Sequence, residues 1–390
     1  MKLGKVKSVG VAAIAATVMF TGCGKLNADA TLVTINTGDG TKDTITLGYG
    51  NFAARYQQSM YDQFLLGYYG ENMWSTDMSN SGSTLQDDTK EGVLTEIEEQ
   101  YLAKLHASDY GVELSEDQKA TIADTATQFI AANSKESLEV MGATEDYVKQ
   151  YLEYRTYYSL VSKAAKEAAD ADITEDDCWM RSFSYVAFET TGTPDEQGNV
   201  VELTEDEIAE KKSQAEELAS AKDFDATVTE LGLTSQTYSY LKGETEDDTM
   251  DMSIIKAAEA LSEGDVSEVI EVEDAGYYVI RLDADHDEDA SQTKRESLQS
   301  EAFDKLMETW KAAITWKVDE KAWAKVDFGN KLFKAPETEE TSEEATTEAA
   351  PTEDTSAEET TTEEDTTAEE DTEETSEEET GEITEDTEAE

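Results

Sequence analysis

Side chains that usually carry enzyme chemistry are scarce in this chain of 390 residues. It contains two histidines, His106 and His286, and two cysteines, Cys23 and Cys178. A metal centre or a catalytic triad built on histidine is therefore almost unavailable, and no disulfide framework is expected. The sequence also carries no phosphate-binding loop and none of the short motifs of serine hydrolases or zinc proteases. We therefore expect no cofactor and no metal site.

One acidic segment, Asp283–Asp289, begins like a calcium-binding loop. A loop of the EF-hand type needs Gly at its sixth position and Glu at its twelfth. The chain has Glu288 and Lys294 at these positions. We interpret the segment as an acidic connection between domains, with a weak divalent-cation site as the alternative.

The formal net charge is −61, from 91 acidic and 30 basic residues. A chain this acidic repels phosphate backbones, so we expect no nucleic-acid partner. Residues 335–390 consist mainly of Glu, Thr and Asp and contain no Lys or Arg. Such a composition cannot bury a core, and it predicts a disordered acidic tail. A solvated brush is its simplest role; a calcium-dependent wall contact and a glycosylated stalk are the alternatives.

The first residues have the pattern of an export signal. Three lysines precede the apolar run Val9–Phe20, and "FTGC" then ends at Cys23. The pattern resembles a bacterial lipoprotein signal, which implies cleavage before Cys23 and a lipid on its thiol. The apolar run is short for a membrane-spanning helix of about 20 residues. We expect a signal peptide at 1–22 and a tether at 23–30; an uncleaved anchor or ordinary secretion is the alternative.

The following residues predict a helical domain behind a pair of short strands. Strand-like runs at Thr31–Asn36 and Thr44–Leu47 flank a glycine-containing turn, and a helix is predicted to begin near Asn51. Apolar residues then recur at three- and four-residue spacing through several more helices. Far along the chain, Ser291–Lys317 is predicted to be one further helix.

Between these helices lies the segment with the clearest pattern, Met250–Leu282. It predicts a short amphipathic helix, a glycine-containing turn and a hairpin whose second strand is the alternating run Tyr277–Leu282. Upstream, Trp179–Phe188 is predicted to be a strand, and a helix capped by Thr204 follows it. This order, with "IIKAAEALSEGDVS" and "GYYVI", resembles a parvulin-type (PpiC-like) peptidyl-prolyl isomerase domain.

The surrounding helices resemble the N-terminal domain of PrsA- and SurA-type extracytoplasmic foldases. The features are the strand pair before a long helix and the segments "ELSEDQ" and "GATEDYVKQYL". The resemblance implies an α+β fold: a mostly helical chaperone domain with an inserted parvulin-like α+β domain, plus a disordered acidic tail. The expected domains are 31–178, completed by 291–334, for the chaperone part and 179–290 for the parvulin-like part.

The resemblance also implies site residues. Parvulins twist an X-Pro bond beside a polar cluster that includes one histidine on the first strand and one on the last. In this chain the last-strand position is Tyr278, and the first-strand position is Ser184 or Tyr185. The family's substrate-pocket positions fall on Met250, Ile254 and Glu259. Because Glu259 replaces an aromatic residue, we expect it to favour basic clients.

The missing histidines predict weak or lost isomerase activity, with binding of unfolded or newly exported polypeptides retained. The leading hypothesis is a lipid-anchored protein-folding factor on the extracytoplasmic face of a bacterial cell membrane. Two alternatives remain: a holdase without catalysis, and a lipoprotein that shares the fold and binds a solute or a partner. The sequence leaves the clients and the oligomeric state open.

Overall fold

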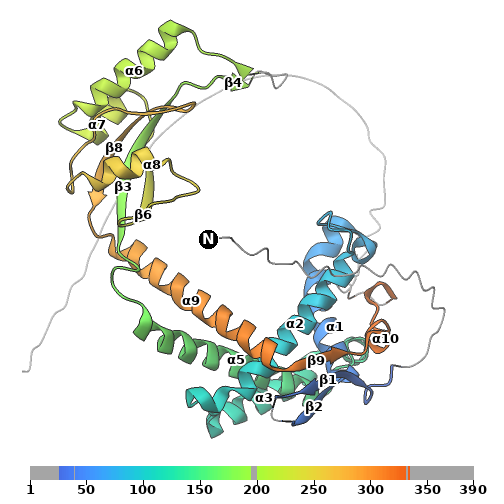
Figure 1. The fold of residues 1–390 in the computed structure, drawn as a ribbon. Coiled ribbons are helices and arrows are strands. Elements are labelled where there is room, and N and C mark those ends of the chain that lie inside the picture. The colour runs from blue at the N-terminus through green and yellow to red at the C-terminus, as the bar shows by residue number, and fades with distance from the viewer. Residues whose placement is uncertain (1–25, 39, 195–199, 331–332, 334–390) are drawn as a thin grey trace, which may run out of the picture. The chain divides into compact units, whose positions relative to one another are not determined.

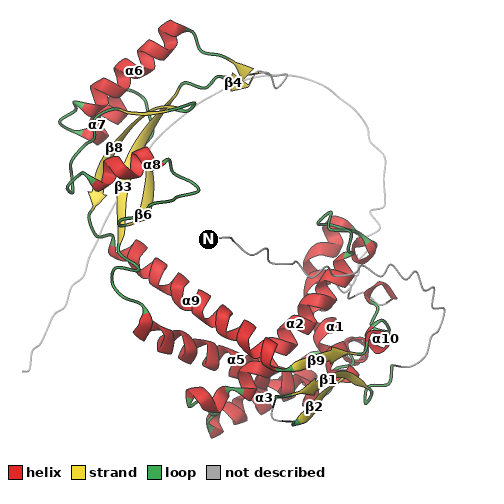
Figure 2. Ribbon diagram, viewed as in Figure 1, coloured by secondary structure: helices red, strands yellow, loops and turns green. Residues whose placement is uncertain are grey.

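The structure is a computed structural model that describes residues 26–38, 40–194, 200–330 and 333. The expected signal peptide, Cys23 and the acidic tail lie outside the described residues. In the described part, helices and strands are mixed, with helices predominating (Figures 1 and 2). This confirms the predicted α+β class. None of the described helices is long and apolar enough to cross a membrane.

The first half of the chain is mainly helical. Between residues 40 and 178 the α-helices are α1 (Leu47–Tyr69), α2 (Leu85–Leu105), α3 (Glu116–Ala132), α4 (Lys135–Met141) and α5 (Glu145–Ala169). A reciprocal capping box between Ser115 and Gln118 starts α3. At α5, the Thr144 hydroxyl accepts a hydrogen bond from the backbone N–H of Tyr147. These side chains satisfy backbone donors that have no partner inside the helix.

Helix α1 begins at Leu47, earlier than the start predicted near Asn51. The preceding strand, β2 (Lys42–Thr46), ends one residue before the predicted end. Thr46 sets the boundary, because its hydroxyl accepts a hydrogen bond from the backbone N–H of Tyr49 at 3.2 Å. Leu47 therefore belongs to the helix, where it is fully buried.

Strand β1 (Thr31–Asn36) pairs with β2 on one side and with β9 (Thr315–Val318) on the other, antiparallel in both cases. The prediction of a helix over Ser291–Lys317 is therefore wrong at its end. Helix α9 spans Glu288–Ala313, and the chain then enters β9. Along β9, exposed and half-buried residues alternate, and Trp316 packs against the core. Period-two burial is the pattern of a strand, so the sheet overrides helical spacing here.

A second antiparallel sheet lies within residues 180–284, with the strand order β6-β3-β8-β7 in the described part. Its strands are β3 (Met180–Glu189), β6 (Gln236–Leu241), β7 (Ile270–Val272) and β8 (Gly276–Ala284). The predicted hairpin turn is confirmed, with φ of 61° at Asp274 and 134° at Gly276. A Cβ at Gly276 would lie 2.3 Å from the Phe188 carbonyl oxygen, so only glycine fits there.

Helices cover both faces of this second sheet (Figure 2). They are α6 (Glu205–Ala219), α7 (Phe224–Glu230) and α8 (Met252–Glu259). Helices α6 and α7 pack on one face, where Leu218 contacts the cluster that contains Val279. Helix α8 packs on the other face, where Ile254 is buried in the cluster that contains Phe183. The short strands β4 (Thr193–Pro194) and β5 (Val200–Val201) form a separate ribbon. On the α8 side, the partly buried residues packed against the cluster include Tyr185, Tyr238 and Tyr278.

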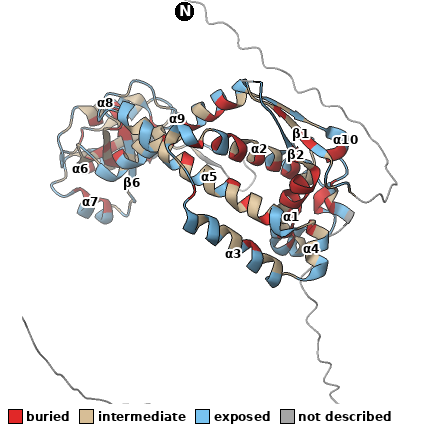
Figure 3. Ribbon diagram, turned by 90° about the horizontal axis from the view of Figure 1, so that it is seen from below, coloured by how far each residue is buried: buried red, intermediate tan, exposed pale blue. Residues whose placement is uncertain are grey.

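Buried residues join the first helices to the last ones. Helix α9 contributes Phe303, Met307 and Trp310 to a cluster that also contains Leu102 of α2 and Val161 of α5. Figure 3 shows further buried residues concentrated along α1 and α2. The last short helix, α10 (Glu320–Trp323), packs into the cluster of α1. By contrast, the two clusters of the second sheet contain only residues from within that part of the chain.

Candidate functional site

Three half-buried tyrosines lie on the α8 side of the second sheet: Tyr185, Tyr238 and Tyr278. We call this surface the aromatic face. Strand alternation places the rings there, since Phe183 and Tyr185 share a face of β3, and Tyr238 and Tyr240 share a face of β6. Phe183 and Tyr240 are almost fully buried beneath them. The face therefore combines partly exposed aromatic surface with hydroxyl groups.

Tyr185 and Tyr278 are neighbours on this face, with ring centroids 6.3 Å apart and ring planes 32° from parallel. The strand register pairs Tyr278 with Ala187, which makes the two tyrosines diagonal neighbours across β3 and β8. Ser184 lies on the opposite face and is buried, and its hydroxyl donates to Asp283 Oδ2 at 2.6 Å. Of the two candidates for the first-strand position, the structure places Tyr185, and not Ser184, beside Tyr278.

Sequence reasoning missed two polar partners of this face. The Tyr238 hydroxyl donates to Asp247 Oδ2 at 2.7 Å, and Asp247 Oδ1 accepts the backbone N–H of Met250 at 2.7 Å. The Tyr185 hydroxyl donates to Gln236 Oε1 at 2.5 Å. The alternation of side chains along β6 could have predicted Gln236, which shares a face with Tyr238, but not Asp247, which lies beyond the strand.

Burial raises the pKa of two phenols of the aromatic face, Tyr238 and Tyr278. It raises the pKa of Tyr238 to about 12, with a further contribution from the hydrogen bond to the Asp247 carboxylate. The pKa of Tyr278 is also raised, by burial first and then by the nearby Glu189 and Tyr185. A neutral phenol can donate a hydrogen bond at pH 7, but it cannot take up or release a proton there as histidine does.

The predicted pocket residues Met250 and Ile254 are core residues. Their side chains are 7% and 1% exposed, and they pack in one cluster with Phe183. They therefore support the aromatic face from beneath and add little to its exposed surface. The partly buried residues beside them include Met252, the first residue of α8.

Glu259, the third predicted pocket residue, is bound to the buried guanidinium of Arg181. Arg181 Nη1 lies 3.2 Å from Glu259 Oε2, and Glu259 Oε1 accepts the backbone N–H of Gly243 at 2.8 Å. Arg181 also donates to the carbonyl oxygens of Ala258 and Leu261, near the end of α8. Glu259 and Arg181 thus fasten α8 to the sheet, and the carboxylate is not free to bind a basic client.

The acidic segment Asp283–Asp289 has structural partners. Its carboxylates are engaged as follows: Asp283 with Arg281, Asp285 with Arg181, and Asp287 with the first turn of α9. Over the described ranges, no group of three or more His, Cys, Asp or Glu side chains is arranged to hold a metal ion. The carboxylates of the segment thus serve ion pairs and the cap of α9.

The histidines and the second cysteine are also packed in structural positions. The imidazole of His286 stacks on Trp179, and that of His106 stacks on Trp310, each with ring centroids 4.3 Å apart. Cys178 is buried, and its Sγ donates to the Thr174 carbonyl at 3.4 Å. Cys178 is thus packed as a small buried side chain.

Comparison with known proteins finds similarity to peptidyl-prolyl isomerase domains and to foldases. Residues 191–286 match the family model of the PPIC-type PPIASE domain. Foldase protein PrsA from Streptococcus equi subsp. zooepidemicus is 28% identical over 216 residues, which cover 52% of this chain and 62% of that protein. Foldase protein PrsA from Clostridium botulinum is 26% identical over 205 residues, covering 48% and 58%. The chain therefore matches less than two thirds of the length of these curated relatives.

Solved structures align with this chain only at low identity and low TM-score. Foldase protein PrsA from Streptococcus pneumoniae aligns at 19% identity and a TM-score of 0.25, covering 65% of this chain and 98% of that chain. A SurA-like chaperone of Campylobacter jejuni aligns at 9% identity and a TM-score of 0.23, covering 74% and 98%. The family-model match and the sequence matches confirm the predicted resemblance to PrsA-type foldases with a parvulin-type domain.

Proposed function

We propose that this chain is a membrane-anchored extracytoplasmic folding factor. It binds unfolded or newly exported polypeptides on the aromatic face and catalyses proline isomerisation weakly or not at all. The observation that carries the proposal is the adjacency of Tyr185 and Tyr278, at strand positions that the family resemblance assigns to histidines. The match of residues 191–286 to the PPIC-type PPIASE domain supports the binding role.

The hydroxyl of Tyr278 is the group that a client can use. The hydroxyls of Tyr185 and Tyr238 already donate to Gln236 and Asp247. Among the described residues, by contrast, none is hydrogen-bonded to the Tyr278 hydroxyl. Tyr278 can therefore donate to the carbonyl oxygen of an X-Pro bond that lies on the aromatic face.

One neutral donor supports only weak catalysis. Rotation about a peptide bond has a barrier of about 18–20 kcal/mol. A neutral hydrogen bond contributes a net of about 0.5–1.5 kcal/mol, and about 1.4 kcal/mol is a tenfold change in rate. Suppose that the hydrogen bond from Tyr278 forms only with the twisted amide and contributes its full value of about 1.5 kcal/mol. The barrier then falls by that amount, and isomerisation is accelerated about tenfold. The aromatic face is thus better suited to binding than to catalysis.

We further propose that a parvulin-like domain, 179–290, is inserted into a helical chaperone domain made of 31–178 and 291–334. The separation of the buried clusters supports this division, because α9 packs with α2 and α5 whereas the second sheet has clusters of its own. The remaining segments are a signal peptide at 1–22, a tether at 23–30 that carries lipid on Cys23, and an acidic tail at 335–390.

The test is a proline-isomerisation assay on a short X-Pro peptide, with the wild type, Tyr278→Phe and Tyr277→Phe. Tyr277 is a matched control, because it precedes Tyr278 in β8 and packs in the cluster on the opposite face. We expect at most about tenfold acceleration by the wild type. Strong acceleration that Tyr278→Phe abolishes and Tyr277→Phe preserves would overturn the proposal of weak activity and make Tyr278 a catalytic residue.

A holdase without any catalysis is the second candidate. An exposed stripe on α1 favours it: Met60, Phe64 and Tyr68 follow at four-residue spacing and are 40%, 65% and 86% exposed. Exposed apolar patches often mark binding surfaces, and unfolded clients present apolar segments that could cover this one. The measurement is suppression of aggregation of an unfolded client. If Phe64→Ser combined with Tyr68→Ser leaves suppression unchanged, the stripe has no holdase role.

A further inference from the structure

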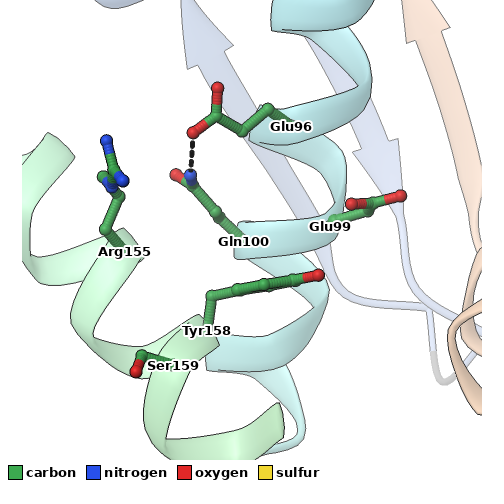
Figure 4. Close-up of a pocket in the computed structure, with 6 residues that line it drawn as sticks. All are labelled: Glu96, Glu99, Gln100, Arg155, Tyr158 and Ser159. Atoms are coloured by element: carbon green, nitrogen blue, oxygen red, sulfur yellow. Dashed lines mark hydrogen bonds between the residues drawn. The ribbon is translucent and has the colours of Figure 1, made fainter. Parts of the chain in front are cut away.

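A polar hollow between α2 and α5 has no part in the proposed site. It encloses about 320 Å³ and is lined by Glu96, Glu99, Gln100, Arg155, Tyr158 and Ser159 (Figure 4). A second hollow, of about 350 Å³, shares Arg155 and Ser159 with it. The lining of this second hollow includes the aromatic and apolar side chains of Tyr56, Tyr151, Leu152 and Leu160. We call the two the polar hollow and the apolar hollow.

Gln100 has a buried acceptor in the polar hollow that lacks a donor. The side chain is 4% exposed, and its Nε2 donates to Glu96 Oε1 at 2.7 Å. Because a carboxylate oxygen only accepts, the amide nitrogen must face Glu96 and the amide oxygen must point away from it. Over the described ranges, Gln100 Oε1 has no hydrogen-bond partner, and in Figure 4 it points toward the side of Arg155. A buried acceptor without a donor is a position where the N–H group of a ligand can bind.

The two carboxylates of the polar hollow differ in their partners. Glu99 forms an ion pair with Lys311 at 2.9 Å. Glu96 is half-buried, and no cation of the described residues lies within 4.0 Å of its carboxylate. Glu96 and Gln100 thus place a charged acceptor and a neutral one side by side. The ligand that suits this pair presents several N–H donors and a positive charge.

We propose that the polar hollow binds the guanidinium of an arginine in an extended polypeptide, while the apolar hollow takes an apolar neighbour of that arginine. A guanidinium carries five N–H donors in one plane, so it can bridge Glu96 and Gln100. The ring of Tyr158, in the same lining, offers a face on which a guanidinium can stack. The identity of the polypeptide as an unfolded client rests on the proposed function; the recognition chemistry depends on the hollow alone.

Arg155 distinguishes a cationic ligand from an anionic or carbonyl ligand, because its own positive charge repels the first and attracts the second. Its Nη1 donates to the Tyr151 hydroxyl at 2.9 Å, and its guanidinium lies 5.5 Å from the centroid of the Tyr151 ring. Arg155 lines both hollows, so its positive charge repels a second cation in either of them. Replacing Arg155 with Gln should therefore tighten arginine binding. If the hollow instead takes a carboxylate or a carbonyl group, the same change weakens binding.

The probes are two labelled, capped peptides in a Gly/Ser frame without proline, one containing Leu-Arg and the other Leu-Gln. Their affinities for the full chain are measured by fluorescence anisotropy at low salt. We expect the wild type to prefer the arginine peptide about tenfold, as for one charge-assisted hydrogen-bonded contact. The preference should fall toward one in Glu96→Gln and in Gln100→Leu, and Arg155→Gln should raise affinity for the arginine peptide several-fold.

Glu91→Gln is the matched control, since Glu91 is exposed on the same helix and does not line either hollow. It makes the same charge change as Glu96→Gln and should keep the preference. Any background binding to the acidic residues 335–390 is common to all variants and cancels in the comparison. If circular dichroism shows that Gln100→Leu does not fold, the preference of Glu96→Gln for the arginine peptide alone tests the proposal.

Three results would overturn the proposal: equal affinity of the wild type for the two peptides, an unchanged preference in Glu96→Gln, or weaker arginine binding in Arg155→Gln. Because the peptides lack proline, Tyr278→Phe should not alter their affinities. Failure in this assay is therefore distinguishable from failure of the proposed function, which the isomerisation and aggregation assays report.

Discussion

Trp310 of α9 stacks on His106 at the end of α2, with ring centroids 4.3 Å apart and ring planes only 7° from parallel. His106 is the C-cap residue of α2, and Trp310 is 7% exposed. The adjacent Lys311 forms an ion pair with Glu99, also on α2. The last long helix is thus fixed to the first half of the chain by stacking, burial and charge together.

Trp310→Ala should lower the free energy of unfolding by about 3–5 kcal/mol, because it removes a large buried aromatic side chain and leaves a cavity. Chemical denaturation followed by circular dichroism measures the change. Tyr69→Ala, at a ring that is 57% exposed, is the control and should have little effect. Equal losses in the two variants would show that α9 does not depend on this contact.

Replacing residues 180–284 by a short linker should leave a folded helical part. The flanking ends already meet, since the Trp179 indole donates to the Asp285 carbonyl at 2.7 Å. Ending the chain at Ala290 instead should destabilise the helices, because Phe303 and Trp310 are then lost from their cluster. Thermal unfolding of the two variants is the measurement, and equal stability would count against the insertion proposal.

Arg181→Leu should destabilise the second sheet and its helices by roughly 1–3 kcal/mol, because the carbonyl oxygens of Ala258 and Leu261 then lose a buried donor. Arg281 in β8 provides the comparison: it also binds two carboxylates, on Asp225 and Asp283, but is 25% exposed, whereas Arg181 is 3% exposed. Exposed pairs contribute about 0–1 kcal/mol, so Arg281→Leu should cost much less. Denaturant midpoints that rank the two variants in the opposite order would contradict this.

Tyr238 should contribute to stability at neutral pH and lose that contribution in alkali. Its pKa is raised to about 12 in the folded chain, against about 10 for an unperturbed tyrosine. The unfolded state therefore loses the proton first, and the contribution fades as pH rises from about 10 through about 12. Tyr238→Phe should make the fall in stability over this range shallower. Tyr68→Phe, at an 86% exposed ring, should leave the profile unchanged.

Cys23→Ala should release the protein from the membrane fraction, because the lipid is expected on this thiol. Cell fractionation and labelling with a radioactive fatty acid are the measurements. Cys178→Ala, at a buried thiol, is the control and should stay with the membrane. A Cys23→Ala variant that remains membrane-bound, together with a wild type that takes up no label, would exclude the lipid anchor.

Much of the fold could be predicted because it is specified locally. The capping box of Thr204 and Glu207 and the turn at Asp274 and Gly276 depend on residues a few positions apart. Their hydrogen bonds and backbone angles form with little help from distant parts of the chain. The order of these local signals was also enough to predict the parvulin-type resemblance.

Only the tertiary structure decided which side chains meet. Whether Ser184 or Tyr185 stands beside Tyr278 depends on strand register, and a shift of one residue would exchange the two faces. Residues Thr315–Val318 form strand β9 and do not continue α9, because their backbone pairs with β1. The local spacing of apolar residues does not reveal this pairing. The sequence predicts Glu259 as a pocket residue, whereas the folded chain places its carboxylate against the guanidinium of Arg181. The buried acceptor of Gln100 arises in the same way, because burial and hydrogen-bond partners are properties of the packed chain and not of any single segment.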